Sequence, residues 1–95
     1  MEPPANFRFV EPGRIALSGA PETPSQVDWL YEQGIRAVLS LHPVSDAVAR
    51  RLEERGIAWL PLLVPDLTSE AAERLATGIA FIERSARDNP ACLIH

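Results

Sequence analysis

The sequence predicts a single α/β domain with a mostly parallel sheet. From residue 35 onward, short apolar segments alternate with segments of helical periodicity. This alternation is typical of βαβ crossovers, which are right-handed and build parallel sheets. The chain has 95 residues, 46% of them hydrophobic and 23% charged, which is the composition of one small globular domain. The expected order is strand, strand, helix, strand, helix, strand, helix, strand.

A hairpin is expected near the N-terminus. Residues 1–6 are rich in proline, and we expect them to form a flexible leader before the hairpin. Residues 7–10 alternate apolar and polar side chains, as a strand does. Pro12 and Gly13 then predict a tight turn. Proline fixes φ at the first central position of the turn, and glycine readily adopts a positive φ at the second. Residues 14–18 are the expected returning strand.

The first helix has a clear start and end. Thr23 is suited to be the N-cap, Pro24 occupies the first helical position, and Gln26 can complete a capping box. Gly34 ends the helix as a glycine C-cap. Residues 35–41 follow as a strand rich in apolar side chains.

A second helix and an edge strand come next. Ser45 begins the helix and Gly56 ends it. Residues 57–64 are apolar throughout and predict another strand. Pro61 within it has no N–H to donate, so this strand is expected at a sheet edge or with a bulge there.

A third, longer helix precedes the last strand. Thr68 or Ser69 begins the helix, and Pro90 stops it. Residues 91–94 form the final short strand, and His95 follows directly. In open α/β sheets, ligands bind just beyond the carboxyl ends of the strands. The polar residues that follow strands are therefore the ones to consider for chemistry.

Composition and charge exclude several classes of function. The net charge is −4 and the pI is near 5.0, which disfavours nucleic-acid binding. The longest apolar stretch, residues 57–64, is far shorter than the about 20 residues of a membrane span, and the N-terminus lacks a secretory signal. The single cysteine excludes an internal disulfide, and no metal-ligand or cofactor motif occurs. We expect a cytoplasmic protein without a cofactor, a metal, a nucleic acid or a membrane as partner.

Few residues suggest chemistry by themselves. Asp66 lies on the expected loop after residues 57–64, where it could act as a general acid or simply favour the N-terminus of the following helix. Cys92 lies inside a strand without nearby cations, so it is expected to be a buried structural thiol rather than a nucleophile. His42 is expected in a loop, and Trp29 and Trp59 at core-facing positions.

The order of motifs resembles the small atypical dual-specificity phosphatases of the cysteine-dependent protein-tyrosine phosphatase superfamily. The resemblance extends from Asn6 to His95. Its motifs are Asn6-Phe7 with Val10 and Pro12-Gly13-Arg14, the helix that ends in Gly34, residues 35–41, Val64-Pro65-Asp66 and Cys92-Leu93-Ile94-His95.

The resemblance implies an α/β fold of the protein-tyrosine phosphatase type. It also implies that residues 7–95 form only part of a dual-specificity phosphatase-like domain. The family signature is H-C-x5-R after a buried strand, and Ile94-His95 matches its lead-in. The nucleophilic cysteine, the phosphate loop and the C-terminal helices are not among residues 1–95. Asp66 matches the general acid, and His95 matches the residue that flanks the nucleophile and orients its loop. The implied substrates are phosphorylated proteins or small phosphomonoesters, cleaved through a phosphocysteine.

The resemblance carries a structural expectation and leaves alternatives open. Without the later helices, one apolar sheet face should be uncovered and could promote self-association. A non-catalytic, pseudophosphatase-like α/β binding module is the main alternative function. Half of a rhodanese-like sulfurtransferase is a third possibility. The Val64-Pro65-Asp66 loop and the long helix after it argue against this third possibility.

Overall fold

The computed structural model describes residues 2–62, 69–87 and 91–95. The predicted order of elements is confirmed within these ranges. The strands are β1 (Arg8–Glu11), β2 (Ile15–Leu17), β3 (Ile35–Ser40), β4 (Ala58–Pro61) and β5 (Ala91–Ile94). The helices are α1 (Pro24–Glu32), α2 (Asp46–Glu54) and α3 (Ser69–Arg87).

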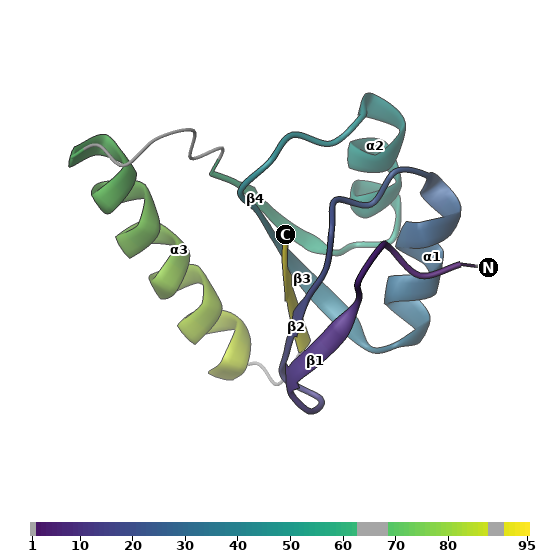
Figure 1. Cartoon of the computed structure of the whole chain (residues 1–95), viewed down its shortest axis with the longest axis horizontal. Coiled ribbons are helices and arrows are strands. Elements are labelled where there is room, and N and C mark those ends of the chain that lie inside the picture. Colours follow the sequence, from purple (N-terminus) through teal and green to yellow (C-terminus); the bar gives the residue numbers. More distant parts are fainter. Residues whose placement is uncertain (1, 63–68, 88–90) are drawn as a thin grey trace.

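The strands form one mostly parallel sheet in the order β1-β2-β5-β3-β4. β1 and β2 are antiparallel and make the predicted hairpin, whereas the β2–β5, β5–β3 and β3–β4 pairs are all parallel. Figure 1 shows α1 and α2 on one face of the sheet and α3 on the other. The predicted fold class is therefore confirmed. The last strand, β5, lies in the middle of the sheet.

The turn and the helix ends follow from local sequence. Gly13 has a φ of 73°, and the Arg14 N–H donates to the Glu11 carbonyl over 3.0 Å, which closes the predicted turn. Thr23 is the N-cap of α1 and accepts from the Gln26 N–H. The capping box differs from the prediction: Gln26 Oε1 accepts from the amide of Glu22, one residue before the cap.

The edge position of β4 explains two properties of this strand. Within the described sheet β4 pairs with β3 alone, so the missing N–H of Pro61 costs no ladder hydrogen bond on the outer side, as predicted. The prediction for Trp59 is wrong, because 36% of this residue is exposed at the edge. Trp29 does pack against the core, and its ring meets Phe7 edge to face at 4.8 Å.

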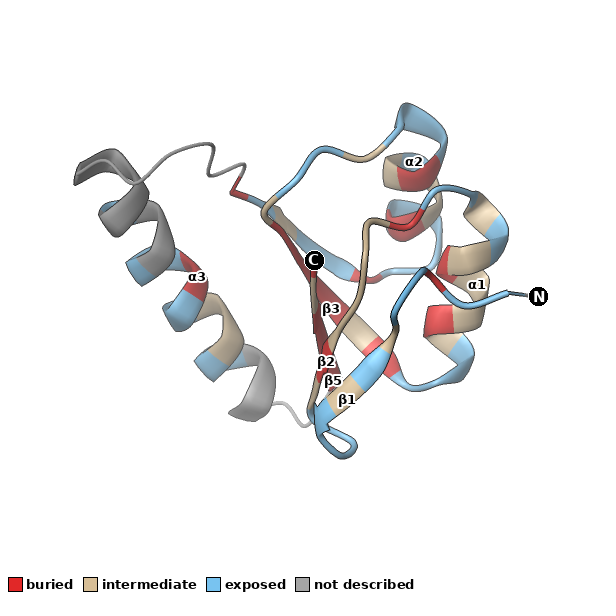
Figure 2. Ribbon diagram, viewed as in Figure 1, coloured by how far each residue is buried: buried red, intermediate tan, exposed pale blue. Residues whose placement is uncertain are grey.

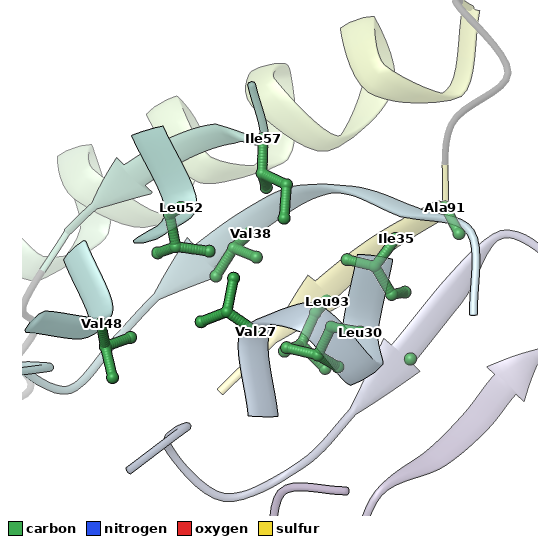
Figure 3. Packing of buried hydrophobic residues seen from close by; sticks show 10 residues of the cluster. Val27, Leu30, Ile35, Val38, Val48, Leu52, Ile57, Ala91 and Leu93 are labelled. Atoms are coloured by element: carbon green, nitrogen blue, oxygen red, sulfur yellow. The ribbon is translucent and has the colours of Figure 1, made fainter. Parts of the chain in front are cut away.

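The main core lies between the sheet and the helices α1 and α2. Figure 3 shows how side chains from both helices and three strands meet there. Its buried members are Ala16, Val27, Leu30, Ile35, Val38, Val48, Leu52, Ile57, Ala91 and Leu93. Burial of each large apolar side chain stabilises the folded state by about 1.5–3 kcal/mol relative to leaving that side chain in water. Asp28 of α1 also joins the two helices, since its carboxylate accepts from Arg51 over 2.6 Å and from Arg55 over 2.8 Å.

The second face of the sheet is covered by α3. Leu39 and Cys92 alternate with core residues along β3 and β5 and are themselves buried. Figure 2 shows the central part of the sheet coloured largely as buried. Gly78 of α3 comes so close that an added Cβ would lie 2.8 Å from Leu62 Cδ1. The expectation of an uncovered apolar face is therefore wrong for the central strands, because α3 packs over β3 and β5.

The N-terminal segment is also attached to the domain. Pro4 is buried, and the Ala5 carbonyl accepts from the Gly19 N–H over 2.7 Å. Residues 4 and 5 of the expected flexible leader therefore contact the rest of the domain, and the loop after β2 supplies the hydrogen-bond donor for Ala5. None of the helices that the structure describes combines the length and the apolar character that crossing a membrane requires.

Candidate active site

The parallel strands bring their carboxyl ends to one edge of the sheet. Ser40 ends β3, and His95 follows β5. Two backbone hydrogen bonds continue the β3–β5 pairing beyond β5, from His95 N–H to the Leu39 carbonyl over 3.1 Å and from Leu41 N–H to the His95 carbonyl over 2.8 Å. His95 is therefore held in register beside the end of β3, at the edge where α/β enzymes place their chemistry.

His95 makes a buried polar contact at this edge. Only 7% of the residue is exposed, and its Nε2 lies 2.6 Å from the hydroxyl oxygen of Ser40. The indole N–H of Trp59 donates to the same hydroxyl over 2.8 Å. His95 Nδ1 is buried and has no hydrogen-bond partner among the described residues. One serine thus links β4, β3 and the residue that follows β5.

Burial controls the charge of His95. Removal from water and, to a smaller extent, the nearby His42 together lower the pKa of the imidazole to about 4. His42 itself is exposed after β3, as predicted for a loop residue. His95 is therefore neutral at pH 7. In this state it can orient a neighbouring group by a hydrogen bond but does not supply a positive charge.

Cys92 is the buried thiol that the sequence predicts. It lies in β5 with 2% exposure, and burial raises the pKa of the thiol to about 11, although a backbone hydrogen bond to Leu39 acts in the opposite direction. A thiol with this pKa is protonated at neutral pH, whereas the nucleophilic form is the thiolate. The structure gives Cys92 no feature of a catalytic cysteine.

The predicted general acid, Asp66, lies outside the described residues, so its role stays a prediction. Leu62 directly follows β4 and is the last described residue before Asp66. Its N–H donates to the Ser40 carbonyl over 2.8 Å. Up to that residue, the segment that leads toward Asp66 follows the end of β3.

Other parts of the described surface offer little for a metal or cofactor. No group of three or more His, Cys, Asp or Glu side chains among the described residues could hold a metal ion. An open hollow of about 400 Å³ lies beside α2 and β4, and Ser40 and His95 do not line it. Its lining residues are Ala49, Arg50, Glu53, Ile57 and Trp59.

Sequence reasoning missed Ser40 and Trp59 as site residues. Ser40 does carry a signal, since it is a small polar residue near the end of an apolar strand. Its partner His95, however, is 55 residues away in the chain, and only the order of strands in the sheet brings the two together.

Comparisons with known proteins agree with this architecture. No protein-family model matches the sequence. The structure is similar to the crystal structure of a mutant form of Tk-PTP, a protein tyrosine phosphatase, with a TM-score of 0.74 and 29% sequence identity. The match covers 94% of this chain and 59% of that one, so this chain spans less than two thirds of its structural neighbour. The domain therefore has a protein-tyrosine-phosphatase-like α/β fold with a mostly parallel sheet.

Proposed function

We propose that residues 7–95 are part of a dual-specificity phosphatase-like domain, and that the whole domain hydrolyses phosphomonoesters in the cytoplasm. The similarity to Tk-PTP carries this proposal, because it extends over 94% of the chain. The place of His95 supports it as well, since this residue follows the central strand β5. The proposed substrates are phosphorylated proteins or small phosphomonoesters.

The proposed reaction proceeds through a phosphocysteine. The thiolate of a cysteine directly after His95 attacks phosphorus, so that an S–P bond forms while the P–O bond to the leaving group breaks. Asp66 donates its proton to the leaving oxygen. A water molecule then attacks phosphorus and gives a proton back to Asp66, and the S–P bond breaks to release phosphate and the thiolate.

His95 has a supporting part in this proposal. Its imidazole is neutral and buried, and Ser40 holds Nε2. Nδ1 therefore remains for the segment that carries the nucleophile. A hydrogen bond from this atom would orient that segment, without His95 exchanging a proton with the substrate.

Substitution of Asp66 tests the assignment of the acid. In the full-length gene product, Asp66→Asn should slow phosphotyrosine hydrolysis by about 10²–10⁴-fold, the usual contribution of a positioned acid. Activated aryl phosphates, whose leaving groups need no proton, should be much less affected. Glu73→Gln is the matched control, because Glu73 is an exposed carboxylate on α3.

The same assay distinguishes the proposal from its alternative. Equal rates for Asp66→Asn and Glu73→Gln on phosphotyrosine would remove Asp66 from the mechanism. A full-length product without turnover that still binds phosphotyrosine would instead indicate a non-catalytic binding module.

A further inference from the structure

Three side chains from different strands form one hydrogen-bonded chain. It runs from Trp59 Nε1 on β4 through the Ser40 hydroxyl on β3 to His95 Nε2, over 2.8 Å and 2.6 Å. Ser40 is fully buried and His95 is 7% exposed, whereas Trp59 reaches the surface with 36% exposure. The chain thus connects the sheet edge to a buried imidazole.

The direction of the hydrogen bonds follows from the chemistry of the three groups. An indole N–H can only donate, so the Ser40 oxygen is an acceptor toward Trp59. If His95 Nε2 also donated to this oxygen, the Ser40 O–H and the Nδ1 lone pair would both lack described partners. If the Ser40 hydroxyl instead donates to Nε2, only the Nδ1–H of His95 is without a hydrogen-bond partner among the described residues. Because buried polar groups are rarely left unpaired, the second arrangement is favoured.

We propose that Ser40 is a positioning residue, which Trp59 holds in place and which fixes His95 in the neutral Nδ1–H tautomer. This inference rests on the proposed function for its consequence: a fixed tautomer keeps Nδ1–H as a hydrogen-bond donor for the segment that carries the nucleophile. The buried surroundings of His95 support the inference, because they keep the imidazole uncharged.

Nitrogen NMR of the histidine rings tests the tautomer directly. In the ¹⁵N-labelled 95-residue chain at pH 7, long-range proton–nitrogen spectra distinguish a protonated ring nitrogen from an unprotonated one. We expect His95 to prefer the Nδ1–H form by about tenfold, the order of one buried hydrogen bond. His42 is the internal control, since an exposed imidazole favours the opposite, Nε2–H form.

Substitutions of the two partners test the positioning role. Ser40→Ala should shift His95 toward the tautomer ratio of His42, and Ser40→Thr, which keeps the hydroxyl, should restore the Nδ1–H form. Trp59→Phe removes the indole N–H at an exposed edge site and should weaken the preference partially. Trp29→Phe is the matched control and should leave His95 unchanged, since Trp29 is not part of this chain.

Two results would overturn the inference. One is an Nε2–H tautomer of His95 in the unsubstituted chain, which needs no variant to fold. The other is an unchanged tautomer in both Ser40→Ala and Trp59→Phe, with native circular dichroism. The NMR measurement uses no substrate, so a lack of phosphatase activity in the full-length product would contradict the proposed function alone. If that product is active, Ser40→Ala should also alter its pH–rate profile, and Ser40→Thr should restore it.

Discussion

The buried imidazole of His95 makes stability depend on pH. Its folded-state pKa is about 4, below the ordinary value of 6.5, so the unfolded chain takes up the proton first as the pH falls. The stability from the neutral imidazole is fully present above pH 6.5 and is lost as the pH falls to 4. The loss amounts to about 3 kcal/mol. Urea unfolding between pH 7 and 4 measures it, with His95→Gln as the variant that should lose this dependence.

The exposed histidine supplies the control for this prediction. His42→Gln should keep most of the pH dependence of the wild type, because burial is the larger cause of the low pKa of His95 and His42 the smaller one. Equal slopes for wild type and His95→Gln would show that His95 is not buried as a neutral group.

Single residues were predictable where local chemistry decides their structure. Gly13 has the predicted positive φ, and Pro61 lies at the predicted edge strand. Cys92 is buried because its neighbours in the strand are apolar. Ser40 and Trp59 were not predicted as partners of His95, because their contact depends on the order of β4, β3 and β5 across the sheet.

At the scale of elements, helix ends were the most predictable feature and helix packing the least. Ser45 caps α2 by accepting from the Val48 N–H over 3.2 Å, which neighbouring residues determine. The place of α3 depends instead on contacts with strands distant in sequence. Gly78 allows this helix to approach Leu39 and Leu62 closely, and the sequence pattern of α3 does not reveal that approach.

The close approach of α3 predicts a size limit at Gly78. Gly78→Ala should change the free energy of unfolding by less than about 1 kcal/mol, because the gain in helix propensity offsets small shifts of two flexible leucine tips. Gly78→Val should destabilise by about 1–3 kcal/mol, since the larger side chain must move α3 away from the sheet. Urea unfolding checks both values.

Ala80 provides the matched control on the same helix. It is exposed, so Ala80→Val should cost less than about 1 kcal/mol, the difference in helix propensity. Equal costs for Gly78→Val and Ala80→Val would contradict the close packing of α3 against β3.

At the scale of the whole molecule, the alternation of strands and helices was sufficient to predict the fold class. The sheet order was not predicted, and it is this order that makes β5 central and places His95 beside Ser40. The prediction of an open sheet face was wrong for β3 and β5, because the position of α3 over these strands depends on contacts between segments distant in sequence. Asp66 lies outside the described residues, so its place in the site still rests on the family resemblance.

We propose above that this domain belongs to a phosphatase that works through a phosphocysteine. Mass spectrometry of the full-length gene product, quenched with acid during turnover of a phosphomonoester, tests it most directly. We expect one phosphoryl group on a cysteine directly after His95, and none on Cys92, whose thiol is buried and protonated. Turnover that continues with a phosphoryl group on Cys92, or without any cysteine after His95, would contradict the proposed phosphocysteine mechanism.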